Sequence, residues 1–413
     1  MSQETIRQYR QSPYNGDLNV AAIASEAVED ALALTNASAN LGAKMLSASL
    51  EFWGGGLKPF AEASRFFKAE AAQPSLDRMP KEAIWEDERA VLYKYATPET
   101  LDPGCEHQEI PLVTVFALMN SGTILGRTLI PKMLNSGFDV FWPDWKKPQR
   151  EAKNSGIEAY FLDTLPKVLE QVKTDAAVEE VSLLGWCQGG YGATILTALQ
   201  EQLAARAGRG QTDLGIRNLI QLTTPLCVSD ADKKCGGFAA MAADPSFDPA
   251  KIVRDNGGIF PGALIDHAAR GLKEYENNIG THFNLMRLIL DGDEAKITRW
   301  EEMNGWTKDL RNMPGQFYIS LIEDLYRHNK LVKGTMVLEG MPVNLANLEA
   351  AVLTIIAEQD HIVTPPETEG AMDLMGSTDH TIIKKPGGHI SVVSPGTCQQ
   401  ISDWLTPRSQ PKQ

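Results

Sequence analysis

The stretch VSLLGWCQGGYGA at positions 181–193 constrains the fold of this chain more than any other feature. An apolar run of strand-forming residues leads into a cysteine between glycines, and a helical pattern rich in alanine and leucine follows. This order predicts a strand, a tight turn and a helix with Cys187 at the turn, the arrangement of a nucleophile elbow. Gly185 and Gly189 would let neighbouring backbone approach, because glycine has no Cβ atom. The dipole of the following helix would favour a thiolate at Cys187.

A buried structural cysteine is the alternative interpretation of Cys187, since free cysteines are usually buried. The chain has five cysteines without a C-x-x-C pair, at positions 105, 187, 227, 235 and 398. This pattern predicts reduced thiols in a cytoplasmic protein, with neither a disulfide framework nor a metal site. The formal net charge of −14 argues against nucleic acid as a partner, because a phosphate backbone requires a basic face. The sequence has no run of about 18 apolar residues, so we expect no membrane span.

Beyond residue 88, apolar runs of strand type alternate with amphipathic helical patterns, which predicts a doubly wound α/β sheet. The predicted strands are residues 88–95, 111–118, 138–142, 181–184, 214–223, 350–357 and 381–384. The predicted helices are residues 126–136, 157–174, the segment from the elbow to about 205, 367–375 and 396–405. The alternation stops at Pro225, and the helical, loop-rich residues 225–345 predict a cap inserted between two strands of the sheet.

The residues before position 77 differ in composition from the rest of the chain. Residues 18–68 are rich in alanine and have apolar residues at helical spacing. We therefore predict an N-terminal helical region at 1–76 and an α/β domain at 77–413. The apolar stripes would form the inner face of a helical bundle. The alternative is a surface for a partner helix or an apolar aggregate. Its anchors would be Phe52, Trp53, Phe60, Phe66 and Phe67.

Two polar residues follow later predicted strands and complete a pattern with Cys187. Asp360 follows the strand at 350–357, and His389 follows the strand at 381–384 within the sequence PGGH. In the α/β-hydrolase fold, an acid and then a histidine follow the nucleophile in this order, each after a core strand. We therefore predict an α/β-hydrolase fold with an inserted helical cap. In this prediction Cys187 is the nucleophile, His389 the general base and Asp360 the group that orients the imidazole.

Further residues are expected to support this chemistry. The backbone N–H of Gln188 would be one oxyanion donor, and a second would come from Asn120 or Ser121 after the strand at 111–118. His361 is a rival base, but a neighbour of Asp360 on an extended segment points away from the site. A thiolate is both a good nucleophile and a good leaving group, so it exchanges acyl groups readily with thioesters. Cysteine in place of serine therefore suggests acyl transfer from a CoA thioester.

From about residue 91 to residue 405, the sequence resembles the catalytic domain of polyhydroxyalkanoate synthases, above all the short class III type. The resemblance is carried by VLYKY (91–95), FALMN (116–120), PDW (143–145), GWCQGG (185–190), TTPL (223–226), FPG (260–262), MPGQFY (313–318), LYRHNKL (325–331), AEQDHIV (357–363) and PGGHI (386–390). It implies an acyltransferase that polymerises (R)-3-hydroxyacyl-CoA, with 3-hydroxybutyryl-CoA as the expected monomer, and releases CoA. It assigns the nucleophile, acid and base to Cys187, Asp360 and His389. It also implies no cofactor beyond the CoA substrate, a homodimer with a mobile cap, and a cytoplasmic location at the surface of polyester granules.

The chain departs from the family pattern at three places. Residues 120–122 read NSG where the family usually has Asn-Arg-Pro, and the cap contains its own sequence DKKCGG at 232–237. The N-terminal region is longer than in class III synthases and shorter than in class I. Its composition is similar to that of granule-associated phasins, and it would replace or receive the helical partner subunit that class III synthases need. Two other functions stay open: a depolymerase or thioesterase on the same scaffold, and a granule-binding protein without turnover.

Overall fold

The computed structural model describes residues 77–97, 106–148, 153–208, 213–228, 237–265, 288 and 291–410. The predicted N-terminal helical region at 1–76, with its five aromatic anchors, lies outside the described residues. So does the cap sequence DKKCGG, except for its last glycine. The predicted domain boundary at 76/77 therefore stays a prediction.

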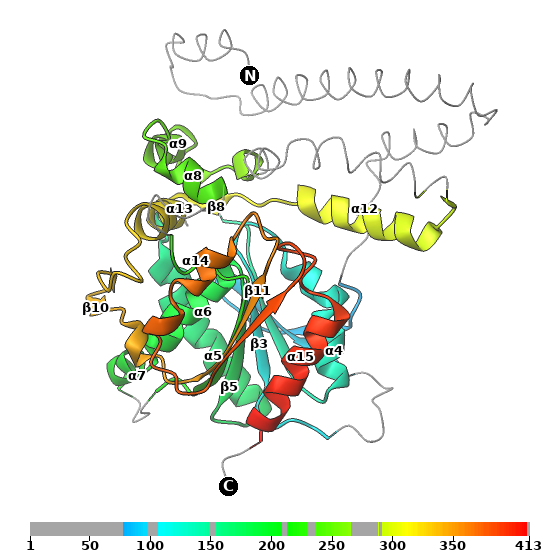
Figure 1. Ribbon diagram of the computed structural model, residues 1–413. Helices are drawn as coiled ribbons and strands as arrows, with labels where there is room; N and C mark the ends of the chain where they lie inside the picture. Colours follow the sequence, from blue (N-terminus) through cyan, green and yellow to red (C-terminus); the bar gives the residue numbers. More distant parts are fainter. Residues whose placement is uncertain are drawn as a thin grey trace, which may run out of the picture. The chain divides into compact units, whose positions relative to one another are not determined.

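An eight-stranded sheet lies at the centre of the described chain, in the order β1-β2-β4-β3-β5-β6-β11-β12 (Figure 1). The strands are β1 (Lys81–Glu86), β2 (Ala90–Tyr95), β3 (Leu112–Val115), β4 (Val140–Trp145), β5 (Val181–Trp186), β6 (Ile216–Leu222), β11 (Ala351–Ala357) and β12 (His380–Lys385). From β4 to β12 all neighbouring strands are parallel, whereas β2 pairs antiparallel with both β1 and β4. This mixed sheet with crossovers confirms the predicted α/β-hydrolase fold.

The central strands are buried on both faces because helices cover the sheet from both sides. All six residues of β5 and all four of β3 are buried, which explains their largely apolar sequences. The helices α5 (Leu165–Ala176) and α6 (Gln188–Ala198) pack on one face, and α4 (Leu129–Asn135) and α15 (Pro395–Leu405) on the other (Figure 1). The strand that the sequence analysis missed is β1, which lies at the sheet edge and carries charged residues at three of its six positions.

Several element boundaries differ from the predictions. A six-residue π-helix, η3 (Ala159–Thr164), precedes α5, and α7 (Gln200–Ala207) continues from α6 after a break at Leu199. The predicted helix at 126–136 begins at Leu129, after the 3-10 turn η1 (Gly122–Arg127). The predicted helix at 367–375 is divided into α14 (Pro365–Glu369) and the 3-10 turn η7 (Met372–Leu374). A last 3-10 turn, η8 (Thr406–Arg408), follows α15.

Between β6 and β11, the described residues add helices and short strand pairs but no strand of the main sheet. The helical elements are α8 (Gly237–Ala243), α9 (Pro249–Asp255), α12 (Glu294–Lys308), α13 (Gly315–Ser320), the π-helix η5 (Leu321–Arg327) and the 3-10 turn η6 (Leu345–Asn347). The strand pairs are β7 (Ile259–Phe260) with β8 (Met313–Pro314), and β9 (Val337–Leu338) with β10 (Met341–Pro342). We refer to the described residues of this region as the cap.

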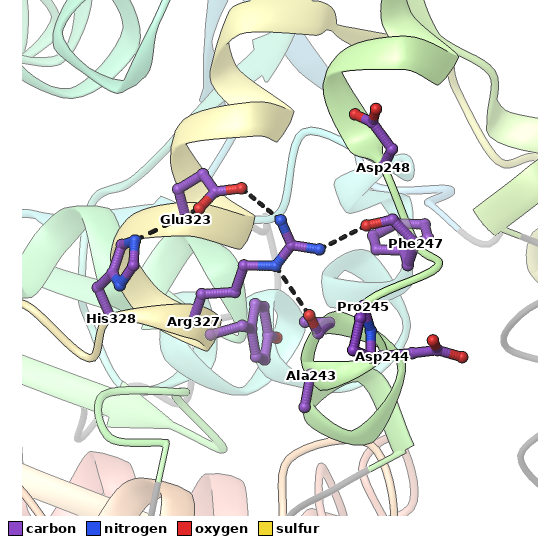
Figure 2. A pocket seen from close by; sticks show the side chains of 10 residues that line it. Ala243, Asp244, Pro245, Phe247, Asp248, Glu323, Arg327 and His328 are labelled. Atoms are coloured by element: carbon purple, nitrogen blue, oxygen red, sulfur yellow. Dashed lines mark hydrogen bonds and ion pairs between the residues drawn. The ribbon is translucent and has the colours of Figure 1, made fainter.

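Arg327 at the end of η5 holds the loop between α8 and α9. Its Nε atom donates a hydrogen bond to the Ala242 carbonyl at 2.9 Å, and its Nη1 atom donates to Glu323 Oε1 at 2.6 Å. A third bond joins Nη2 to the Phe247 carbonyl (Figure 2). These bonds border a hollow of about 640 Å³ between η5 and the α8–α9 loop, which Tyr326 also lines. The guanidinium thus joins η5 to the segment between α8 and α9.

Arg311, which follows α12, connects the cap to the loop after β3 and to the C-terminal end of β4. Its backbone N–H donates to the Met119 carbonyl at 2.8 Å, in the loop that follows β3. Its Nη1 atom donates to Asp144 Oδ1 at 3.0 Å and to the Trp145 carbonyl at 2.6 Å, both in β4. Burial raises the pKa of Asp144, and the charge of Arg311 lowers it. The ion pair therefore offsets part of the cost of burying this carboxylate.

An Arg311→Met substitution tests this connection. We expect the free energy of unfolding to fall by about 1–3 kcal/mol, since the Asp144 charge loses its partner but keeps some contact with water. The double variant Arg311→Met with Asp144→Asn should recover part of the loss, because no unpaired charge remains. Urea unfolding of the full-length variants measures both values. A double variant at least as unstable as Arg311→Met alone would contradict the role of the ion pair.

Candidate active site

Cys187 occupies a strained turn between β5 and α6. Its backbone angles are φ 55° and ψ −126°, a conformation that residues with side chains rarely adopt. Its N–H donates to the Leu222 carbonyl in β6 at 3.0 Å, and its carbonyl accepts from the N–H of Gly190 at 2.9 Å. The strain is therefore held by the neighbouring strand and by the first turn of α6, and the side chain stays partly exposed.

The glycines around Cys187 are required by space. A Cβ atom at Gly189 would lie 2.2 Å from the Val115 carbonyl oxygen, and one at Gly185 would lie 2.3 Å from the Cα atom of Gly190. Gly190 has a similar limit, because its Cβ would lie 2.0 Å from the Thr224 hydroxyl. The close approach of backbone that the sequence predicts at Gly185 and Gly189 is confirmed, and it brings the ends of β3 and β6 against the elbow.

Asp360 and His389 lie together at the same edge of the sheet. Asp360 follows β11, His389 follows β12, and the His389 Nδ1 atom is 2.7 Å from Asp360 Oδ2. The other carboxylate oxygen, Oδ1, accepts the backbone N–H groups of Ile362 at 2.8 Å and Val363 at 3.0 Å. A carboxylate with both oxygens engaged as acceptors keeps the proton of His389 on Nδ1. The Nε2 atom of the imidazole is then the atom left for Cys187.

The electrostatic balance at His389 favours its charged form. Burial by itself would lower the pKa of the imidazole. The negative charge of Cys187 and the hydrogen bonds to Asp360 and Cys187 outweigh burial and raise this pKa to about 10. Only 9% of His389 is exposed, so bulk water weakens these interactions little. This arrangement is suited to an imidazolium beside a cysteine thiolate.

The residues expected to form the oxyanion site lie close to the elbow. Gln188 is the first residue of α6, and its side-chain Oε1 atom accepts the N–H of Leu118 at 2.8 Å, which joins the loop after β3 to the elbow. Asn120 Oδ1 accepts the N–H of Ser121 at 2.6 Å, and the Ser121 hydroxyl accepts the N–H of Thr123 at 3.3 Å. The backbone donor of Ser121 is thus used within the loop. The assignment of the oxyanion donors stays a prediction.

Some residues near Cys187 were not singled out from the sequence. Burial raises the pKa of the Tyr326 phenol, and the charges of Glu367 and Cys187 raise it further, so this cap residue lies within electrostatic range of the nucleophile. Trp186 lies between Gly185 and Cys187 and packs near His389. The sequence signal that could have identified Trp186 is its position next to Cys187 in the elbow. In the part of the chain that is described, no cluster of three His, Cys, Asp or Glu side chains could hold a metal ion.

A Gly189→Ala substitution tests the steric requirement at the elbow. The added Cβ would press on backbone that cannot rotate away, so we expect a loss of about 2 kcal/mol or more in the free energy of unfolding. Gly388→Ala is the matched control near His389, because its Cβ would have no neighbour closer than 3.7 Å. Thermal unfolding of both variants measures the difference. Equal stability of the two would show that the elbow can relax around a side chain.

Comparisons with known proteins found one family model and several relatives that match this chain. A family model described as PHB de-polymerase C-terminus matches residues 253–397. The poly(3-hydroxyalkanoate) polymerase subunit PhaC of Allochromatium vinosum is 29% identical over 338 residues, which cover 80% of this chain and 89% of that protein. PhaC of Thiocystis violacea is 27% identical over 339 residues, with coverage of 80% and 89%. A solved monoacylglycerol lipase from Paleococcus ferrophilus is 16% identical, covers 77% of this chain and 99% of its own, and has a TM-score of 0.43. Over about 80% of its length, the chain is thus similar to poly(3-hydroxyalkanoate) polymerase subunits.

Proposed function

We propose that this protein is an acyltransferase that polymerises (R)-3-hydroxyacyl-CoA into polyester and releases CoA, with 3-hydroxybutyryl-CoA as the expected monomer. The observation that carries the proposal is the hydrogen-bonded Asp360–His389 pair beside Cys187 on a strained elbow. The names of the relatives support the polymerase activity. The choice of a CoA thioester is supported by the cysteine nucleophile, which exchanges acyl groups with thioesters.

The first step loads the enzyme. His389 takes the proton of Cys187, and the thiolate attacks the thioester carbonyl carbon, so that a new carbon–sulfur bond forms. The N–H of Gln188 donates to the resulting oxyanion. The bond to the CoA sulfur then breaks, and the departing CoA thiolate takes the proton from His389. An acyl group on Cys187 remains, and Asp360 holds the imidazole in place through Nδ1.

The second step extends the polymer. His389 takes the proton of a 3-hydroxyl group, whose oxygen attacks the acyl carbon on Cys187. The ester bond forms, and Cys187 leaves as a thiolate, which regains the proton from His389. The resemblance gives Asp360 a second role in activating this hydroxyl. Both carboxylate oxygens of Asp360 are already hydrogen-bonded, to two backbone N–H groups and to His389. This supports activation of the hydroxyl by Asp360 through the imidazole.

A hydrolase on the same scaffold is the second candidate. The family model that matches residues 253–397 carries the name of a depolymerase region, which is the observation that favours it. The two reactions share the acyl-cysteine and differ in whether water or a hydroxyacyl group attacks it. The cap contacts to the loop after β3 support the synthase, because exclusion of water protects the acyl-cysteine.

We further propose a homodimer in the cytoplasm, located at the surface of polyester granules. The N-terminal region would take the place of a helical partner subunit or receive one, or bind a phasin-type protein. Among the described residues, no helix is both long and apolar enough to cross a bilayer. Deletion of residues 1–76 tests the role of this region. If granule association and partner binding do not change in the deletion variant, the proposed role is wrong.

A Cys187→Ala variant tests the mechanism with 3-hydroxybutyryl-CoA as substrate. We expect CoA release to fall by about three orders of magnitude or more, because the variant has no nucleophile. Cys227→Ala is the matched control, since Cys227 is a buried cysteine on the loop after β6 and has no role in the proposed chemistry. The measurements are free CoA, detected with a thiol reagent, and sedimented polymer.

The products separate the two functions. Free CoA with insoluble polymer supports the synthase, and free CoA with soluble hydroxy acid identifies a hydrolase. No CoA release from the unmodified protein would overturn both. A Cys187→Ala variant that released CoA at the normal rate would overturn the cysteine mechanism itself.

A further inference from the structure

Four aromatic rings form a row from the candidate general base to the cap. The ring of Trp186 lies 6.3 Å from that of His389, with 36° between their planes. On its other side, Trp186 makes an edge contact with Phe116 at 5.1 Å, and Phe116 lies 6.2 Å from Trp306 in α12. We call these four residues the aromatic row. It joins the end of β5, the loop after β3, the loop after β12 and the cap.

The indole of Trp186 is held in the row by packing alone. The residue is 1% exposed, and its Nε1 atom is buried without a hydrogen-bond partner among the described residues. A buried N–H without an acceptor is unfavourable, so a polar contact of this atom does not explain a tryptophan here. The contacts of the ring itself are those with the imidazole at 6.3 Å and with Phe116 at 5.1 Å, measured between ring centroids.

The cap end of the row is fixed by two hydrogen bonds. Trp306 Nε1 donates to the Ser121 carbonyl at 2.8 Å, and the Trp306 carbonyl accepts from Asn120 Nδ2 at 3.3 Å. Both partners lie in the loop that begins at Phe116. The position of α12 is therefore linked to that of Phe116, and through Phe116 to the indole that packs on His389.

We propose that Trp186 is a positioning residue for His389, and that the aromatic row makes this positioning depend on the docked cap. The inference rests on the proposed Cys187–His389 pair. Asp360 binds the imidazole at Nδ1, and Cys187 is its second hydrogen-bond partner. Both contacts depend on the orientation of the ring, which the packing of the indole, 6.3 Å away, helps to fix. The indole also favours a positively charged imidazolium, since an aromatic ring attracts a nearby cation.

The pH dependence of Cys187 alkylation reports this effect without any turnover. Cys187 and Asp360 are the ionisable groups that face His389, and Tyr326 and Glu367 lie on the cap side and after β11. The pair makes Cys187 reactive above a lower pH limit, at which the thiolate forms, and we call the pH values above this limit the reactive range. Misalignment weakens the stabilisation of the thiolate by the imidazolium, so the lower limit rises and the reactive range narrows.

The experiment follows the reaction of full-length protein with iodoacetamide, with modification of the Cys187 peptide quantified by mass spectrometry. Trp186→Leu should raise the lower limit of the reactive range by about half a pH unit. Trp186→Phe should keep the wild-type range, because it keeps a ring and removes an N–H that has no acceptor. Trp306→Leu should narrow the range in the same direction as Trp186→Leu. If Trp186→Leu does not fold, Phe116→Leu takes its place, since it withdraws the support behind the indole.

Trp404→Leu is the matched control. Trp404 belongs to the same apolar cluster as Trp186 but lies outside the row, where its Nε1 atom donates to the Thr381 hydroxyl at 3.1 Å. Its loss should lower stability and leave the reactive range unchanged. A Trp186→Leu profile that equals the wild type would overturn the positioning role, and an unchanged Trp306→Leu profile would overturn the link to the cap. His389→Ala separates these results from the proposed function, because a reactive range unaffected by that variant would refute the Cys187–His389 pair itself.

Discussion

The positive φ angle of Cys187 is the constraint on which the rest of the structure depends. A side chain in that conformation needs neighbours that fix the backbone, and the bond from its N–H to the Leu222 carbonyl makes β6 one of them. The other neighbour is β3. Its Val115 carbonyl comes so close to Gly189, the second residue of α6, that no side chain fits there. The turn at Cys187 therefore requires β3, β5 and β6 to lie side by side in the sheet. Because β11 extends the same sheet beyond β6, the loop that carries Asp360 emerges at the same edge as the elbow.

The loop after β3 has a second function, since it connects the elbow to the cap. Leu118 binds the Gln188 side chain, while Met119 binds the backbone of Arg311, so adjacent residues face the two parts of the molecule. The segment expected to stabilise an oxyanion is thus also the segment on which α12 is docked. The elbow and the cap are therefore linked through one loop, because adjacent residues of that loop bind each of them. The aromatic row extends this dependence to the general base.

The sequence predicted the parts of the site that follow directly from local order along the chain. Cys187, Asp360 and His389 each follow an apolar strand, and parallel strands end at one edge of a sheet, so their meeting could be expected before any coordinates were known. Contacts between distant segments left no such signal. The packing of Phe116 on Trp306 joins residues 190 positions apart, and nothing in either neighbourhood indicates the other. The edge strand β1 was missed for a different reason, since charged residues on a solvent-facing edge hide its strand character. The oxyanion donors depend on the turn of one loop, which local sequence does not determine.

In the proposed mechanism, the choice between polymer and free acid does not depend on the side chains of Cys187, Asp360 and His389. A thiolate leaves an acyl group equally well for water and for a hydroxyl, and His389 can take a proton from either. The selectivity must therefore come from which of the two reaches the acyl carbon. The cap lies next to the groups concerned, since Trp306 and Arg311 bind the loop after β3 and Tyr326 lies within electrostatic range of Cys187. Access to an acyl group on Cys187 would therefore be set by the cap rather than by the elbow or the Asp360–His389 pair.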